Sequence, residues 1–371
     1  MWISGSRPTE PGHPPSRHTD RVALVAGLLI TAAILSGSWH NARAAEPTPN
    51  ASTDVAAKER IELFLALLKR RAHEALEAHR PPPPPLITYA ASLSQGYESN
   101  VNLDGNKRGD FFTQEEASLT LRPRLTSWLR GELTYEALHS HYAELRDANL
   151  WMNTLGTTVQ LQPHTRFQVD LGYEYTIANF PFDTSNGFFD HSTSVKVSFA
   201  QTRWLTQQTG WTYLTREYDT RNARDGDGTN LLGMVREDRR HTVSHDLRFR
   251  FANTSLRVGG QAYWNASNDA FLDFYDWQDY QLRGVVSHVL SPSWIGLMVG
   301  SYERRNYEAR RVPVINIAER DTLLTWAGSL IYQLNDHTQL TYGLTYRHQD
   351  SNDPRLDFID WINRFQVSLE F

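Results

Sequence analysis

The chain ends on the stretch Ile359-Asp360-Trp361-Ile362-Asn363-Arg364-Phe365-Gln366-Val367-Ser368-Leu369-Glu370-Phe371. Alternate residues counted back from Phe371 are almost all apolar, and the residues between them are mostly polar or charged. This period of two predicts a β-strand with one apolar and one polar face. A terminal aromatic residue on such a strand is typical of the last strand of a bacterial outer-membrane barrel, although a soluble β-sandwich strand shows the same alternation.

The same alternation recurs through most of the chain. In the segment 165–178, Phe167 and Val169 share one face, whereas Gln168 and Asp170 share the other. Fourteen such segments are predicted as strands, at residues 86–99, 111–122, 126–141, 149–162, 165–178, 187–200, 203–218, 238–251, 254–267, 277–290, 293–307, 319–334, 337–349 and 359–371.

The connections between these segments alternate in length. Tight links fall at residues 122–124, 162–164, 201–202, 253–254, 291–293 and 335–337. Longer polar loops fall near residues 100–110, 142–148, 179–186, 219–237, 268–276, 308–318 and 350–358. Short periplasmic turns and long extracellular loops are the pattern of outer-membrane barrels, and a closed barrel leaves no unpaired backbone in lipid. We therefore predict an all-β fold, a 14-stranded antiparallel transmembrane β-barrel over residues 86–371, with both barrel ends periplasmic.

Tryptophans lie near both ends of the predicted strands. Those shortly after a tight link are Trp128, Trp204 and Trp294, and those at the loop ends are Trp151, Trp264, Trp277 and Trp361. Aromatic girdles at both membrane interfaces are expected of an outer-membrane barrel but not of a soluble β-protein. The tryptophans therefore favour the barrel.

Composition excludes several classes of protein. The 371 residues carry 37 basic and 42 acidic side chains, a net charge of −5, and no cysteine. The chain therefore has no disulfide framework, no thiol chemistry and no lipidated N-terminal cysteine. The absence of a basic stripe argues against binding to nucleic acid. The mean hydropathy of −0.52 averages over alternating faces and is compatible with a barrel.

Residues 1–44 are predicted to be a signal peptide for export. An apolar run from Val22 to Gly37 follows Arg17 and Arg21, and an Ala42-Arg43-Ala44 site follows the run, so we expect cleavage after Ala44. The alternative is an uncleaved inner-membrane anchor, for which the run is short.

Residues 45–85 are predicted to form a periplasmic amphipathic helix and a spacer. Apolar residues follow helical spacing within residues 54–79, and Pro81–Pro85 then imposes a stiff polyproline spacer. A lone amphipathic helix must bury its apolar stripe. It is expected to lie against the periplasmic rim, to bind a partner or a second copy, or to plug the barrel.

Charged residues on the polar face should line the lumen. The predicted lumen-lining residues are Arg130, Glu132, Glu136, Arg166, Asp170, Glu174, Lys196, Arg216, Asp246, Arg248, Arg250, Arg257, Arg283, Arg347 and Arg364, and Glu370 shares their face. They either pair into a satisfied polar interior or line a hydrated channel for an anionic or sugar solute. Fourteen strands are compatible with both.

No catalytic residue, cofactor or metal ligand is predicted. His241 and His245 share the lipid-facing parity while Asp246 has the other, so they form no local hydrolase site. His139 and His141 share a strand face but lie near a loop, which favours an interfacial position over a metal site.

A stretch from Asp225 to Asn230 opens like a calcium-binding loop. It lacks the glycine at its sixth position, and its twelfth position is Arg236 rather than glutamate. An ordinary surface loop is the better interpretation. Phosphate-loop, zinc and dinucleotide signatures are absent, and the sequence predicts a protein that is not an enzyme.

Two stretches resemble a known family. Gly96-Tyr97-Glu98-Ser99-Asn100-Val101-Asn102 is similar to the run at the first barrel strand of surface lipoprotein assembly modifiers (Slam) and of related barrels associated with exopolysaccharide export. Asp350-Ser351-Asn352, with Asp360 and Arg364, looks like the last hairpin of the same family. The resemblance covers residues 86–371 and implies a fourteen-stranded translocation barrel. Slam proteins carry a tetratricopeptide-repeat domain ahead of the barrel, whereas this chain has no such 34-residue repeat there.

The sequence thus predicts an outer-membrane conduit, with a Slam-like export barrel as the first hypothesis. A general porin for small polar or anionic solutes, and a closed structural or adhesive barrel, are the alternatives. Expected partners are outer-membrane lipid and the barrel-assembly machinery, which would read Phe371. A periplasmic repeat protein or a lipoprotein client is a further candidate partner.

Overall fold

The computed structural model describes residues 86–103, 107–271, 275–312 and 316–371. The predicted signal peptide, helix and polyproline spacer lie outside these residues, and so does the cleavage site after Ala44. The described chain forms fourteen strands: β1 (Ile87–Glu98), β2 (Asp110–Leu121), β3 (Leu129–Tyr142), β4 (Leu150–His164), β5 (Phe167–Asn179), β6 (Phe188–Ala200), β7 (Leu205–Arg224), β8 (Asn230–Arg250), β9 (Thr254–Ser267), β10 (Trp277–Ser291), β11 (Trp294–Arg311), β12 (Ala318–Gln333), β13 (Thr338–Ser351) and β14 (Phe358–Glu370).

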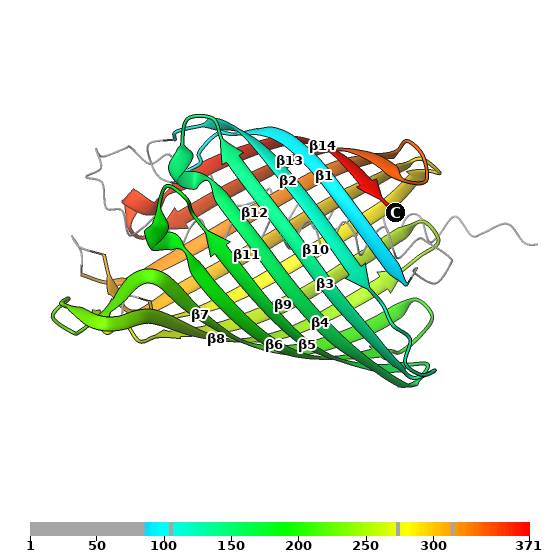
Figure 1. Ribbon diagram of the computed structural model, residues 1–371, viewed down its shortest axis with the longest axis horizontal. Coiled ribbons are helices and arrows are strands. Elements are labelled where there is room, and N and C mark those ends of the chain that lie inside the picture. The colour runs from blue at the N-terminus through cyan, green and yellow to red at the C-terminus, as the bar shows by residue number, and fades with distance from the viewer. Residues whose placement is uncertain (1–85, 104–106, 272–274, 313–315) are drawn as a thin grey trace, which may run out of the picture. The chain divides into compact units, whose positions relative to one another are not determined.

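These strands make one closed antiparallel barrel. Every strand pairs with its sequence neighbours, and β1 pairs with β14 from Ala90↔Glu370 to Glu98↔Ile362 (Figure 1). The predicted 14-stranded antiparallel barrel is confirmed. We call the end with the short connections the turn end and the opposite one the loop end. Short 3-10 helices lie in three loop-end connections: η1 (Arg146–Ala148), η2 (Thr184–Asn186) and η4 (Pro354–Leu356). Within the described residues, no helix is long and apolar enough to cross a membrane.

Two predicted connections differ from the structure. The segment 219–237, predicted as a loop, is largely a continuation of β7 and β8, which project past their neighbours at the left of Figure 1. Outside a membrane both faces of a hairpin can be polar, so the alternation that marks a strand is lost. Pro163, predicted in a tight link, lies within the end of β4, where the register with β5 shifts between Leu161 and His164. A proline is tolerated at such an irregularity because it needs no ladder hydrogen bond.

The two faces of the strands differ as the alternation predicts. Large apolar side chains such as Leu93, Phe365 and Tyr342 lie exposed on the outside. Residues of the opposite parity face the lumen, and many are buried and polar, for example Ser94 and Asp279. The outer surface of the described barrel is therefore apolar and its inner surface is polar.

Six of the seven tryptophans assigned to girdles lie exposed on the outside: Trp128, Trp151, Trp204, Trp264, Trp294 and Trp361. Trp277 is the exception, and its assignment to the outer girdle is wrong. It is 7% exposed and pairs in register with Asn265, which is buried on the inner face. Its ring lies beneath the guanidinium groups of Arg305 and Arg240, so it packs inside the lumen.

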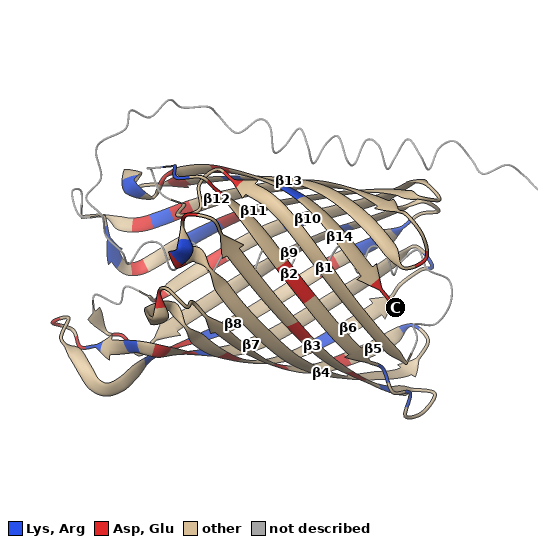
Figure 2. Cartoon of the chain, turned by 45° about the horizontal axis from the view of Figure 1, so that its top comes forward, with Lys and Arg blue, Asp and Glu red and all other residues tan. Residues whose placement is uncertain are grey.

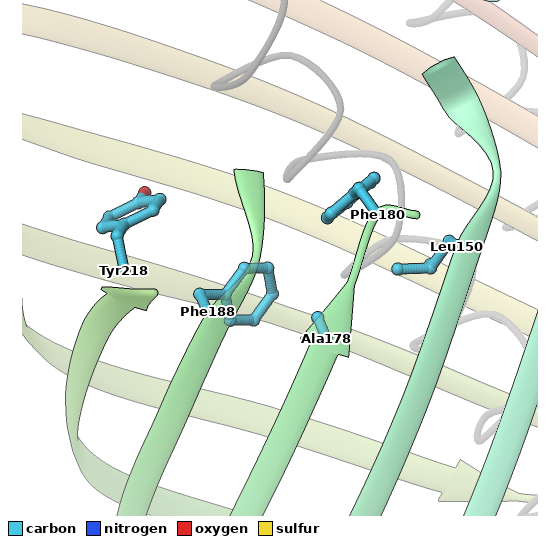
Figure 3. Close-up of a cluster of buried hydrophobic side chains, with 5 residues drawn as sticks. All are labelled: Leu150, Ala178, Phe180, Phe188 and Tyr218. Atoms are coloured by element: carbon cyan, nitrogen blue, oxygen red, sulfur yellow. The ribbon is translucent and has the colours of Figure 1, made fainter. Parts of the chain in front are cut away.

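One part of the inner surface is apolar. Leu150, Ala178, Phe180, Phe188 and Tyr218 form a buried cluster near the loop ends of β4 to β7 (Figure 3). Ala178, Phe188 and Tyr218 occupy one register row across β5, β6 and β7. This row fills one side of the lumen with apolar side chains.

Candidate functional site

Arginines at the loop end of the lumen pair with carboxylates and stack on aromatic rings. Figure 2 shows basic and acidic residues interleaved at this end of the strands. We call five of these arginines the loop-end belt: Arg216 with Asp190, Arg224 with Asp269, Arg236 with Asp238, Arg305 with Asp279, and Arg310 with Glu319. Their N–O distances run from 2.5 to 2.9 Å. Charge-assisted pairs of this kind fix geometry strongly.

Two members show how the sequence builds the belt. Arg216 on β7 stands directly opposite Asp190 on β6, and both its Nε and Nη2 donate to that carboxylate at 2.7 Å. Its guanidinium carbon lies 3.6 Å from the centroid of the Phe188 ring. Arg305 repeats the arrangement with Asp279, and its guanidinium lies 3.8 Å from the Trp277 ring. Removing one partner of such a buried pair costs about 3–5 kcal/mol, because the other charge is left uncompensated.

A second cluster lies where β1 meets β14. Arg347 on β13 donates to Asp360 on the neighbouring β14 and reaches across β14 to Glu98 on β1. Asp360 is fully buried and also accepts hydrogen bonds from the Ser99 hydroxyl and the Asn100 backbone N–H. Glu98, Ser99 and Asn100 are therefore joined to Asp360 and Arg347 across the closing seam of the barrel.

A third cluster spans β8 to β10. Asp246 on β8 accepts from Arg257 on β9 and from Arg283 on β10, with 2.8 Å between its Oδ2 and each Nη2. Gly259 lies between Asp246 and Arg283 in the register and lets the two side chains meet over bare backbone. A Cβ built there would lie 1.9 Å from Oδ1 of Asp246. The space that a side chain would fill is used by the ion pair.

The lumen is more open toward the turn end. Arg130, Glu136, Glu174 and Arg250 are exposed there or midway along their strands, although they lie on the inner face. Three further lumen residues toward the turn end are half-buried. Glu132 pairs with Arg122, and Asp170 accepts hydrogen bonds from Gln160 and Gln168. Lys196 stands opposite Asp170 in the register. The inner surface is thus tightly paired at the loop end and accessible to water toward the turn end.

The remaining predicted lumen residues occupy varied positions. Arg166 lies in the turn between β4 and β5 and is exposed. Arg364 reaches over β1 to Gln114 on β2 at 3.5 Å, and Glu370 is half-buried near the end of β14. Arg248 is half-buried on β8, directly opposite Arg257. The structure brings together Asp246, Arg257 and Arg283, with Arg248 and Arg250 on the same wall.

Sequence reasoning missed a repeated Ser-Asn-Asp motif that anchors two loops to the preceding strand. Ser267-Asn268-Asp269 and Ser351-Asn352-Asp353 end β9 and β13 and continue into the following loops. Each asparagine side chain accepts from one backbone N–H and donates to one backbone carbonyl of the preceding strand. Each aspartate pairs with an arginine. The repeated Ser-Asn-Asp tripeptide, four strands apart, was the available signal.

The second of these loops carries ionisable groups whose pKa values are shifted in opposite directions. Burial alone would raise the pKa of the Asp353 carboxyl, but hydrogen bonds from the side chain and backbone of Arg355 hold it below its usual range. Burial raises the pKa of Asp357, against the hydrogen bond that it accepts from the Ser351 N–H. The connection between β13 and β14 thus places two carboxyl groups with shifted pKa values at the loop end of the barrel.

The candidate histidine sites are occupied by aromatic contacts. The His139 ring stacks on Trp151 at 4.0 Å, and its centroid lies 6.5 Å from that of His141. His245 meets the Thr209 hydroxyl on the outer face, away from Asp246. The described residues contain no group of three acidic or histidine side chains placed to hold a metal ion.

The loop that opens like a calcium site is a tight turn. Asp225 accepts hydrogen bonds from the backbone N–H groups of Asp227 and Thr229 at 3.0 and 2.9 Å. The carboxylate oxygen Oδ1 is used to organise the turn itself.

No protein-family model and no curated protein matches the chain. Solved structures with a similar barrel include OmpT of Vibrio cholerae, 9% identical with a TM-score of 0.45, covering 79% of this chain and 100% of that one. A bacterial polysaccharide outer membrane secretin is 12% identical with a TM-score of 0.42, covering 76% and 98%. An anion-selective porin from Comamonas acidovorans is 8% identical with a TM-score of 0.43, covering 77% and 98%.

Proposed function

We propose that this chain is a non-enzymatic conduit across the bacterial outer membrane. The observation that carries the proposal is a closed barrel with an apolar exposed exterior around an inner face of water-accessible charges. Lipid stabilises such an exterior, and the exposed tryptophans at both ends match its interfaces. The inner charges need water or a polar solute.

The proposed orientation follows the lengths of the connections. The turn end faces the periplasm and the loop end faces the outside, as in other outer-membrane barrels. In this orientation β1 begins at the periplasmic end of the barrel, and residues 45–85 are proposed to be periplasmic. The water-accessible half of the lumen is open to the periplasm, and the loop-end belt frames the outer mouth.

The finer proposal is a Slam-like export barrel that works with a separate periplasmic partner. Its support is the likeness of residues 96–102 and 350–352, with Asp360 and Arg364, to that family. The second candidate is a porin for small anionic solutes, which the arginines on β8 to β10 favour. A conduit for a protein client and a porin differ in whether they pass small solutes without a partner.

Planar-bilayer conductance of the refolded barrel tests the proposal. A stable open channel in the full-length chain favours the porin, whereas current only after deletion of residues 45–85 indicates a plug. Arg248→Glu is expected to shift selectivity toward cations, because it reverses a charge on the lumen wall. Absence of current from both proteins would contradict the porin, and unchanged selectivity would contradict a wet lumen at Arg248.

A further inference from the structure

A second apolar patch lies on the inner wall of the barrel, where β10, β11 and β12 approach the turn end. These three strands are neighbours in the barrel (Figure 1). Their inner residues form three register rows of mostly apolar side chains: Val285, Val299 and Ala327; Ser287, Leu297 and Ser329; and Val289, Ile295 and Ile331. We call these residues the turn-end patch.

The turn-end patch faces the lumen and is bounded by polar wall. Its residues share strand parity with Arg283, which is buried inside, whereas Met298 and Leu330 between them are exposed on the outside. The residues paired with the patch on the two flanking strands are polar, charged or glycine: Arg257 and Ser255 on β9, and Thr345, Gly343 and Thr341 on β13. Apolar side chains on a lumen wall are unfavourable in contact with water. The patch therefore needs a cover.

The patch is buried and dry. Leu297 and Val299 are each 3% exposed, and the buried Ser287 hydroxyl has no hydrogen-bond partner among the described residues. Fourteen strands spaced about 4.8 Å apart and tilted by about 40° enclose a lumen roughly 28 Å across between facing backbones. Side chains of the facing wall are too short to cover the patch across that width. A helix about 10–12 Å thick fits the space.

Residues 54–79 have the chemistry that the patch requires. Their apolar side chains follow helical spacing in one stripe: Ile61, Phe64, Leu65, Leu68, Ala72, Ala75 and Leu76. A single helix cannot bury such a stripe by itself. Arg70 and Glu74 fall on the opposite side of the same helical period. They would meet the polar wall at β5, seven strands from β12, which carries Gln168 and Asp170.

The length of the chain allows residues 54–79 to reach the patch. β1 begins at Ile87, opposite Leu121, and so at the turn end where the patch lies. Residues 80–86 include Pro81–Pro85 and span about 20 Å in polyproline geometry. Through the seam, β12, β11 and β10 stand three, four and five strands from β1. At about 4.8 Å per strand this distance is roughly 14–24 Å, which the spacer covers without unpairing β1.

We propose that residues 54–79 enter the lumen from the turn end as a helix and dock their apolar stripe on the turn-end patch. The chain thereby carries its own plug, which narrows the path through the barrel until it is displaced. The inference rests on the proposed conduit for its purpose, because a plug matters only where the lumen passes a solute or a client. The docking itself depends on the patch and the stripe.

Thiol labelling of the refolded full-length chain tests the docking, because the sequence has no cysteine of its own. Leu297→Cys reports on the patch. Thr158→Cys lies on the inner face of β4, seven strands from β11, and reports on the opposite wall. We expect Leu297→Cys to react with a water-soluble maleimide at least about tenfold more slowly than Thr158→Cys, because its thiol is reached only when the helix leaves.

Substitutions in the stripe identify the occupant. Leu65→Asp combined with Leu68→Asp should speed the labelling of Leu297→Cys at least about tenfold, because carboxylates are costly to bury against apolar side chains. Arg70→Asp is the matched control, since it makes the same change in net charge on the opposite side of the helical period. That control should alter the rate by less than about twofold.

Heat-modifiable migration on gels checks that each variant is folded, and Val299→Cys replaces Leu297→Cys if the latter does not fold. Fast labelling of Leu297→Cys beside the unaltered stripe would overturn the docking. Slow labelling that persists in the stripe variant would overturn it too, because the cover is then not residues 54–79. Protection that is lost on dilution would identify a second copy as the cover and would also overturn it. The expected labelling without channel current in any variant would retain the docking and refute a conduit for small solutes, and current with fast labelling would do the reverse.

Discussion

Gly259 is a position at which a single methyl group should disrupt the ion pairs of the lumen wall. In Gly259→Ala the new Cβ would lie 1.9 Å from Oδ1 and 2.7 Å from Cγ of Asp246, and 2.8 Å from the backbone oxygen of His245. None of these separations is tolerated by real atoms, so the Asp246 carboxylate must turn away from Arg257 and Arg283. The perturbation removes the central acceptor without changing any charge.

The size of the effect follows from burial. The Asp246 and Arg283 side chains are 4% and 6% exposed, so separating them leaves charges with little access to water. Breaking a buried pair costs about 3–5 kcal/mol. Alanine recovers roughly 0.5–1 kcal/mol because it loses less backbone entropy than glycine in a strand. We expect Gly259→Ala to lower the free energy of unfolding by about 2–4 kcal/mol.

Equilibrium unfolding in guanidinium, followed by tryptophan fluorescence of the refolded barrel, measures this free energy. Gly260→Ala is the matched control, because its Cβ would meet only the Gln281 carbonyl oxygen at 3.7 Å. That control should be neutral or slightly stabilising. In an Asp246→Ala background the cost of Gly259→Ala should fall, since only the His245 contact remains. A cost no larger than that of Gly260→Ala, or one unchanged in that background, would refute the reasoning.

Three further predictions concern the seam, the terminus and a loop. Asp360→Asn should lower the free energy of unfolding by about 3 kcal/mol, because it weakens a fully buried acceptor, whereas Asp350→Asn at an exposed position should change it by less than about 0.5 kcal/mol. Deleting Phe371 should reduce membrane insertion, measured as the amount of heat-modifiable barrel in membranes. Tyr89→Leu removes only the ring that stacks on Phe371 at 5.0 Å and should leave insertion unchanged. Normal levels of the truncated chain would contradict the role of Phe371 in assembly. The lowered pKa of Asp353 means that its contribution to loop stability is present above about pH 4, the unfolded carboxyl pKa, and is lost as pH falls through the lower folded value. The loop amides of Asp353→Asn should therefore be less protected against hydrogen exchange than those of the unaltered chain at neutral pH, and equally protected in strong acid. Equal protection at neutral pH would contradict this prediction.

The strands could be predicted wherever lipid requires an apolar outer face. The exception, the hairpin of β7 and β8, extends where no lipid demands alternation, so its polar sequence resembles a loop. Trp277 shows a different limit. Its position along the strand suited a girdle, but it shares parity with Asp279 and Arg283, which face inward. Parity, which the sequence shows, should have outweighed the general preference of tryptophan for interfaces.

The charged residues of the lumen could be predicted, but most of their partners could not. Parity alone assigns Arg347 to the inner face. Its partner Glu98 lies 249 positions away and two strands across the closing seam, and only the register of β1 with β14 sets their separation. Asp246 and Arg283 likewise meet across an intervening strand, over Gly259. Such pairs depend on how the strands are staggered, which alternation does not reveal.

The seam between β1 and β14 decides how the barrel closes. Closing the barrel joins the chain segments that are farthest apart in sequence, so it carries the largest loop-closure entropy of any strand pairing. The hydrogen bonds of Ser99 and Asn100 to Asp360 offset part of that entropy. Glu98 and Asp360 lie at this seam, whereas Asp246 and Arg283 lie on β8 and β10, far from it in strand order. A substitution at the seam should therefore act on how the barrel closes, whereas a substitution at Asp246 or Arg283 should act on the lumen wall.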